Sequence, residues 1–114
     1  MTDQIEVKAQ ELVDTIRNSE IYAEYQRARK ILRQYPEKLR AVQEFRTERY
    51  NLQSTTEEID LFKETDKLDK KYNHLAEDPV IEAYLEAENS FFKIIREISW
   101  KLVLDLDIAD TLDN

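Results

Sequence analysis

Apolar residues recur along this chain at intervals of three and four positions, which is the spacing of one face of an α-helix. Five such runs are separated by polar or proline-containing breaks at 18–19, 36, 54–56 and 78–79. We therefore predict an all-α fold in a single domain over residues 1–114. The expected architecture is an antiparallel helical bundle of four to five helices, with coiled-coil-like heptad seams and a long C-terminal helix.

The first two helices are expected to start at capping residues. Asp3 with Glu6 forms a capping-box pattern for the first helix, and Ser19 is a suitable N-cap for the second. The apolar positions of the first helix share one face: Ile5, Ala9, Leu12, Val13 and Ile16. Those of the second helix step by four and three as a heptad seam: Ile21, Tyr25, Ala28, Leu32 and Tyr35.

Pro36 should end the second helix and start the third, because proline suits the first helical turn. The seam of the third helix is Leu39, Val42, Phe45 or Arg46, and Leu52. Thr55 and Glu58 form another capping box, and the seam of the following helix is Leu61, Thr65, Leu68, Tyr72 and Leu75. The break at 54–56 separates two helices or only kinks one long rod, and the sequence leaves both open.

The fifth helix is predicted from Pro79, with Asp78 as its N-cap, to about Leu104. Its seam is Ile81, Tyr84, Glu88, Phe91, Ile95, Ile98 and Leu102, but its second half is apolar on every side. Such a helix is roughly 39 Å long, too long for a single small subunit to surround. We predict a homo-oligomer, a dimer or larger, with this candidate interface: Phe91, Phe92, Ile95, Ile98, Trp100, Leu102 and Leu104.

The composition narrows the possible chemistry. The 114 residues include no glycine, which excludes glycine-rich phosphate loops, and no cysteine, which excludes disulfides, thiolate metal sites and nucleophilic thiols. Residues 1–10 are polar and acidic, and no apolar stretch is long enough to cross a bilayer. We expect no signal peptide, no membrane insertion and a cytoplasmic protein.

Charge is distributed unevenly along the chain. The net charge is −8, which disfavours binding to nucleic acids and anionic lipids. Residues 27–49, however, hold eight basic and three acidic side chains. This basic stretch is a candidate partner-binding surface, with these residues foremost: Arg27, Arg29, Lys30, Arg33, Lys38 and Arg40. Because Tyr25, Tyr35 and Phe45 interleave with it, an RNA-associated helical module is the alternative function.

Catalytic and metal-binding patterns are not apparent. Di-iron bundles need Glu-x-x-His pairs, whereas His74 is the single histidine and Lys71 stands three residues before it. Glu88 lies on the apolar seam of the fifth helix, where a carboxylate is expected to pair with a basic residue of a neighbouring helix. We expect no catalytic residues, no metal and no cofactor, so an enzyme is the least supported class.

Two segments of the chain carry a recognisable motif. They are residues 19–25, followed by Ala28 and Pro36, and residues 78–88, where an Asp-Pro precedes Tyr-Leu-x-Ala-Glu. In these segments the chain resembles the YlbF/YmcA family, which consists of small helical regulators of Gram-positive bacteria. The resemblance implies an oligomeric, cytoplasmic protein without catalytic activity that acts in competence, sporulation or biofilm control. It also implies partners: a YaaT-like protein and, through that complex, the endoribonuclease RNase Y in mRNA maturation.

Two features depart from the family pattern. The link between the third and fourth helices is short and lacks the glycine that the family often has. The cysteines that some members use for iron–sulfur clusters are also absent, so a cluster-dependent role does not carry over.

Overall fold

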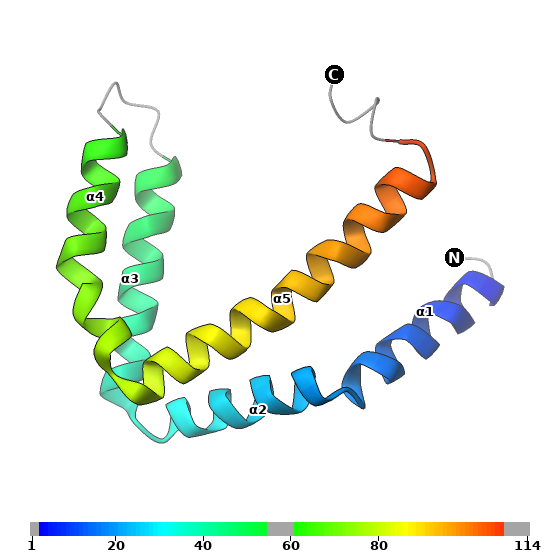
Figure 1. Ribbon diagram of the computed structural model, residues 1–114, viewed down its shortest axis with the longest axis horizontal. Coiled ribbons are helices and arrows are strands. Elements are labelled where there is room, and N and C mark those ends of the chain that lie inside the picture. The colour runs from blue at the N-terminus through cyan, green and yellow to red at the C-terminus, as the bar shows by residue number, and fades with distance from the viewer. Residues whose placement is uncertain (1–2, 55–60, 109–114) are drawn as a thin grey trace. The chain divides into compact units, whose positions relative to one another are not determined.

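The computed structural model describes residues 3–54 and 61–108, and within them it contains helices and no strand. The elements in chain order are α1 (Asp3–Arg17), α2 (Glu20–Arg33), α3 (Pro36–Ser54), α4 (Leu61–Tyr72), the short 3-10 helix η1 (Asn73–Glu77) and α5 (Pro79–Asp105) (Figure 1). The predicted all-α fold and long C-terminal helix are confirmed.

The break between α1 and α2 is made by two polar side chains, as predicted. Asn18 donates to the Asp14 carbonyl twice, from its backbone N–H over 3.1 Å and from its side-chain amide over 2.9 Å, at the end of α1. The Ser19 hydroxyl accepts a hydrogen bond from the Tyr22 backbone N–H at 3.2 Å and so caps α2. Asp3, expected as the cap of the first helix, is instead the first residue of α1.

α3 and α4 are two antiparallel helices rather than one continuous rod (Figure 1). The rings of Phe45 and Tyr72 lie 5.2 Å apart, and the Lys71 ammonium is 3.1 Å from the Glu48 carboxylate. In one helix, residues 45 and 72 would be roughly 40 Å apart at 1.5 Å per residue. The capping box expected at Thr55 and Glu58 lies outside the described residues.

The contacts divide the chain into two compact units, each described here by itself. The first unit comprises residues 1–26 and 86–114, and the second comprises residues 27–85. Every buried residue of the described ranges belongs to the second unit: Leu32, Val42, Leu68, Leu75, Ile81 and Tyr84. All six are predicted seam positions, and α2, α3, α4, η1 and α5 each contribute to this core. The predicted single domain stays a prediction.

The first unit is held by an aromatic cluster between α2 and α5. The Tyr25 ring stacks on Phe91 at 5.0 Å and lies 5.9 Å from Phe92, while Tyr22 lies 5.4 Å from Phe91. Such ring pairs add about 0.5–1.5 kcal/mol each beyond the area that they bury. Phe91, one of the predicted interface residues, therefore packs against α2 of the same chain.

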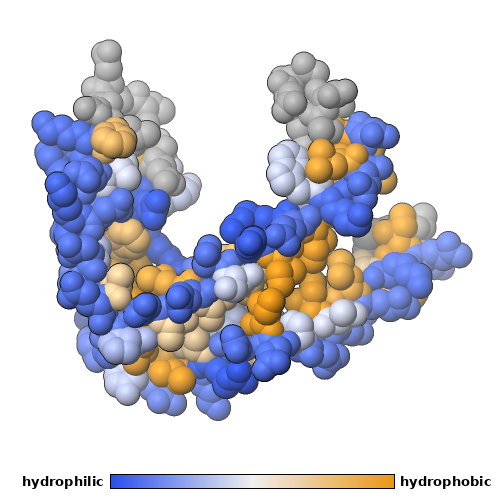
Figure 2. Space-filling view, viewed as in Figure 1, coloured by the Kyte–Doolittle hydropathy of each residue, from blue (hydrophilic) through white to orange (hydrophobic). Residues whose placement is uncertain are grey.

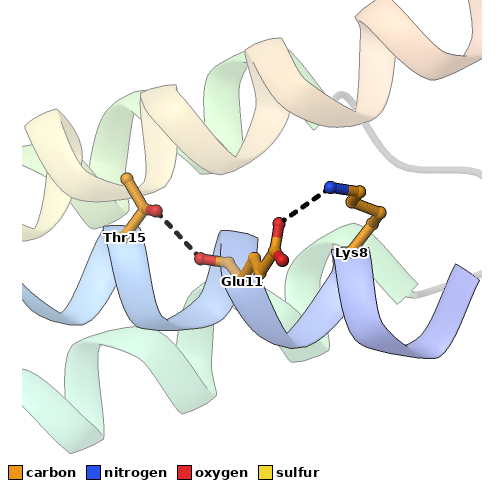
Figure 3. A network of polar contacts seen from close by, with 3 residues as sticks. All are labelled: Lys8, Glu11 and Thr15. Carbon is orange, nitrogen blue, oxygen red and sulfur yellow. Dashed lines mark hydrogen bonds and ion pairs between the residues drawn. The ribbon is translucent and has the colours of Figure 1, made fainter. Parts of the chain in front are cut away.

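Two polar contacts within α1 join residues three and four positions apart on the same helix. The Lys8 ammonium pairs with the Glu11 carboxylate at 3.3 Å, and the Thr15 hydroxyl donates to the Glu11 carbonyl over 2.8 Å (Figure 3). All three residues are exposed, so these contacts support the helix itself by only a few tenths of a kcal/mol.

The junction before α5 rests on the two oxygens of Asp78. Oδ1 accepts hydrogen bonds from the backbone N–H groups of Val80 (2.9 Å) and Ile81 (3.2 Å), which confirms the predicted N-cap. Oδ2 lies 2.9 Å from the Lys38 ammonium at the start of α3. The hydrogen bond from Lys38 lowers the pKa of Asp78, and the same bond raises the pKa of Lys38. One side chain therefore caps α5 and ties it to α3.

α5 ends in a turn that usually requires glycine. Asp107 has a φ of 57°, in the left-handed region, and its N–H donates to the Leu104 carbonyl. The Ile108 N–H donates to the Val103 carbonyl over 3.1 Å, and the two bonds together form a Schellman motif. An aspartate thus occupies the left-handed position at the end of α5.

Leu32 is 1% exposed, so truncating its side chain should destabilise the fold more than truncating any other core residue. We expect Leu32→Ala to lower the free energy of unfolding by about 2–5 kcal/mol, because it leaves a cavity in the small core. Urea denaturation followed by circular dichroism measures the loss. Ile31→Ala on the same helix, where Ile31 is 46% exposed, is the control and should cost about 0.5 kcal/mol or less. Equal losses in both variants would contradict the described core.

The two roles of Asp78 can be separated by substitution. Asn is also a good N-cap, so Asp78→Asn should keep the cap, lose the ion pair with Lys38 and lower the thermal midpoint at pH 7 by a few degrees. Asp78→Ala removes both roles and should lower the midpoint further.

The difference between wild type and Asp78→Asn should depend on pH. Because the pKa of Asp78 is lowered by folding, its ion pair stabilises the fold fully above 3.8, and that stability is lost as the pH falls below this value. The raised pKa of Lys38 keeps the contribution constant up to about pH 10.5. Thermal melts from pH 7 down to pH 2 test this, and a difference that stays constant would refute it.

Candidate functional site

The basic stretch lines a pocket within the second unit, which we call the arginine pocket. It has a volume of about 220 Å³, and its walls come from α2, α3 and the first part of α5. The lining residues are Arg29, Leu32, Arg33, Leu39, Val42, Gln43, Arg46 and Tyr84. Three of these residues are arginines and none is acidic, so the pocket is cationic.

The floor of the arginine pocket is part of the core. Leu32 and Val42 are 1% and 2% exposed, and Tyr84 is also buried. The Arg46 guanidinium lies over the Tyr84 ring at 5.5 Å and donates from Nη1 to the Tyr84 hydroxyl oxygen at 3.5 Å. A cation over an aromatic face is favourable by about 0.5–2 kcal/mol. The fold therefore holds one arginine of the pocket in place.

A neighbouring depression between α3 and α4 has a different charge character. Its lining combines two lysines and two glutamates, and the pairs are formed: Lys71 with Glu48 at 3.1 Å and Lys67 with Glu64 at 3.4 Å. The bond from Lys71 lowers the pKa of Glu48, and the same bond raises the pKa of Lys71. This depression is internally neutralised, which distinguishes it from the arginine pocket.

Only some of the predicted partner-binding residues share the arginine pocket. Arg29 and Arg33 line it, whereas Arg27 lies about 160° around α2 from Arg29. Arg40 lines a separate depression, together with Glu44 and Glu48.

The other basic residues, Lys30, Lys38 and Arg46, have different surroundings in the structure. Lys38 is engaged by Asp78, and Lys30 is exposed on α2. Arg46 lines the pocket but was not among the foremost candidates, although the seam of α3 left Phe45 or Arg46 open. An arginine at a possible seam position was the signal that could have identified it.

The second candidate surface is an apolar face of the first unit, seen as an orange area over α1 and the second half of α5 (Figure 2). Its members are exposed large side chains on more than one side of each helix: Ile5, Val7, Leu12 and Val13 of α1, and Phe92, Ile95, Trp100, Leu102 and Leu104 of α5. Trp100 and Leu104 are each 58% exposed. Of the predicted interface residues, Phe91 and Ile98 are half-buried and the other five are exposed.

The two remaining candidates of the sequence analysis, His74 and Glu88, differ in exposure. His74 is exposed in η1, and its ring lies 6.4 Å from Tyr72. In residues 3–54 and 61–108, no group of three or more His, Cys, Asp or Glu side chains is placed to hold a metal ion. Glu88 is half-buried on α5. No helix in the described part of the chain is long and apolar enough to span a bilayer.

Comparison with known proteins gives one match. Neither the curated proteins nor the solved structures yield a match to the chain. A family described as "Control of competence regulator ComK, YlbF/YmcA" matches residues 5–106, a range that contains both segments on which the resemblance rests. Because this match covers most of the chain and reaches from α1 to the end of α5, the chain belongs to the YlbF/YmcA family of competence regulators.

Proposed function

We propose that the chain is a non-enzymatic cytoplasmic regulator that self-associates through its first unit and binds other proteins through its second. Family membership supports a regulatory role in the control of competence. The resemblance described above supports a YaaT-like protein and RNase Y as the partners, with competence, sporulation or biofilm formation as the process regulated. A helical fold with two distinct candidate binding surfaces is consistent with a protein that acts by binding other proteins.

The exposed apolar face of the first unit is the observation that carries this proposal. In the described residues 3–26 and 86–108, no side chain is fully buried, although many are large and apolar. Burying a Leu or Phe side chain contributes about 1.5–3 kcal/mol, and ordering a residue costs a comparable amount. A unit with so little internal burial gains its stability when a second surface covers it. Contiguous exposed apolar patches commonly mark such interfaces.

The second half of α5 offers apolar residues on opposite sides. At about 100° per residue, Trp100 and Leu104 share one side of the helix, and Ile98 lies about 160° from Trp100. The seam side already receives Tyr22 and Tyr25, through their contacts with Phe91. The side of Trp100 is therefore the part of the candidate interface that we assign to a second copy of the chain.

Two observations favour a protein partner over RNA. A single-stranded RNA reader needs aromatic faces for base stacking. Two of the three aromatic residues that interleave with the basic stretch are instead packed within the fold, since Tyr25 stacks on Phe91 with an interplanar angle of 13° and Phe45 packs against Tyr72. The third, Tyr35, is exposed, but the Lys38 ammonium lies over its ring at 4.7 Å. Because the net charge is also −8, the electrostatic attraction that drives RNA binding is weak over most of the surface.

Light scattering tests the self-association. The wild-type chain at micromolar concentration should have at least twice the mass of the 13.7 kDa monomer. The double variant Trp100→Glu/Leu104→Glu should shift towards the monomer, because two carboxylates cannot be buried without partners. Multi-angle light scattering over a dilution series measures both.

The control places the same two charges elsewhere on α5. Asn89 and Ser90 are exposed, and Asn89→Glu/Ser90→Glu should keep the wild-type mass. A monomeric wild-type chain, or equal effects of the two double variants, would contradict the assigned interface.

Gel shifts at two salt concentrations test the choice between protein and RNA. We expect the purified chain to give no shift with a single-stranded oligouridylate at either low or physiological salt. A shift that weakens steeply with salt would favour the RNA-associated alternative, because each neutralised phosphate adds to the salt dependence.

A further inference from the structure

We propose that the arginine pocket binds a side-chain carboxylate from an acidic segment of a partner protein, with an adjacent apolar side chain of that segment resting on Leu39. This inference rests on the proposed function, since it names the partner chemistry of the second unit. The composition, size and rigidity of the pocket support it.

The charge of the pocket selects an anion. Arg29 and Arg33 come from adjacent turns of α2, and Arg46 comes from α3, so three guanidinium groups line one small space. Its eight lining residues include no carboxylate. Arginine is well suited to carboxylates, because its planar fork can donate two parallel hydrogen bonds to the two oxygens.

Contacts within the chain do not prevent such binding. Arg33 and Arg46 are exposed, and Arg29 is half-buried. At an exposed guanidinium such as that of Arg33, an ion pair or hydrogen bond contributes about 0–1 kcal/mol, so a ligand carboxylate can join or replace it at little cost.

The small volume of the pocket and the exposed part of Leu39 favour a peptide side chain over a larger free ligand. Pockets for small molecules usually measure about 300–1,000 Å³, and this one is about 220 Å³. That space suits one or two side chains. The half-buried Leu39 supplies an apolar surface beside the arginines, whereas Leu32 and Val42 beneath it are almost fully buried. This matches a segment where acidic and apolar residues are neighbours.

The site is largely formed before a partner arrives. Leu32, Val42 and Tyr84 are among the most buried side chains described, so the floor has little freedom to rearrange. Arg46 is stacked on Tyr84, which reduces the side-chain entropy lost on binding. A preformed site of this kind binds a mobile acidic segment at a lower ordering cost.

The surroundings disfavour an extended polyanion. The depression lined by Arg40 on α3 also contains Glu44 and Glu48, and α3 carries Glu37 in its first turn. A nucleic-acid strand presents phosphates at every nucleotide and would meet these carboxylates. A single carboxylate on a short segment avoids them.

Fluorescence anisotropy with the full chain tests the proposal. The probe is a fluorescein-labelled ten-residue peptide of alternating aspartate and leucine, and the comparison peptide has asparagine in place of each aspartate. We expect the acidic peptide to bind and the neutral one to bind at least about tenfold more weakly. Arg33→Gln/Arg46→Gln should weaken binding of the acidic peptide by about tenfold or more, because each arginine contributes a charge-assisted hydrogen bond.

The control variant removes the same amount of charge from the same two helices. Arg27→Gln/Arg40→Gln lies outside the pocket and should change the dissociation constant by less than about threefold, an effect of net charge alone. Circular dichroism of both variants checks that they remain helical. Equal losses in the two variants would overturn the proposal, as would equal binding of the two peptides or no binding at all.

Two further measurements distinguish peptide binding in the pocket from nucleic-acid binding and from self-association. In the first, a labelled oligouridylate replaces the peptide. If the wild-type chain binds the oligouridylate but not the peptide, and only Arg33→Gln/Arg46→Gln abolishes that binding, the pocket binds nucleic acid and the proposal is overturned. Light scattering of the same samples reports self-association independently. If oligomers persist while the peptide fails to bind, the pocket proposal fails and the proposed self-association stands.

Discussion

Burial of six apolar side chains in one small core is the constraint on which the described structure depends. Leu32, Val42 and Tyr84 close this core from α2, α3 and α5, while Leu68 and Leu75 attach α4 and η1. The same packing brings Arg29 and Arg33 beside Arg46. Because the chain is only 114 residues long, it buries a modest apolar area, and little of that area belongs to the first unit. The concentration of buried side chains in the second unit therefore explains both the arginine pocket, which is built on that core, and the apolar side chains left exposed in the first unit.

Much of this fold could be predicted from the sequence because its signals are local. Heptad spacing identified every buried residue described, and Ser19 and Asp78 marked helix starts through hydrogen bonds to N–H groups two or three residues away. Whether residues 54–56 kink a rod or separate two helices could not be predicted. That outcome depends on contacts between residues far apart in sequence, such as Phe45 with Tyr72. Tyr35, expected in the core, is exposed beneath the Lys38 ammonium, since it sits at the turn before Pro36.

The candidate site was predicted less completely, for a related reason. Counting charges along 27–49 identifies a basic stretch but gives no direction to its side chains. α2 turns Arg27 and Arg29 to nearly opposite sides, and the fold commits Lys38 to Asp78. Arg46 joins the pocket only because Tyr84, 38 residues later, lies beneath its guanidinium. Apolar periodicity likewise marked the seam of α5 beyond Tyr84 without indicating what covers it.

The Schellman turn at Asp107 extends a rule that holds at Ser19 and Asp78. In this chain without glycine, the helix boundaries at Ser19, Asp78 and Asp107 depend on polar side chains with specific hydrogen bonds or on an aspartate that accepts a left-handed backbone, and proline begins α3. Apolar core positions often accept another side chain of similar volume. Boundary positions have fewer acceptable replacements, because few residue types cap a helix or tolerate positive φ. Sequence drift in this protein should therefore be constrained at its turns as strictly as in its interior.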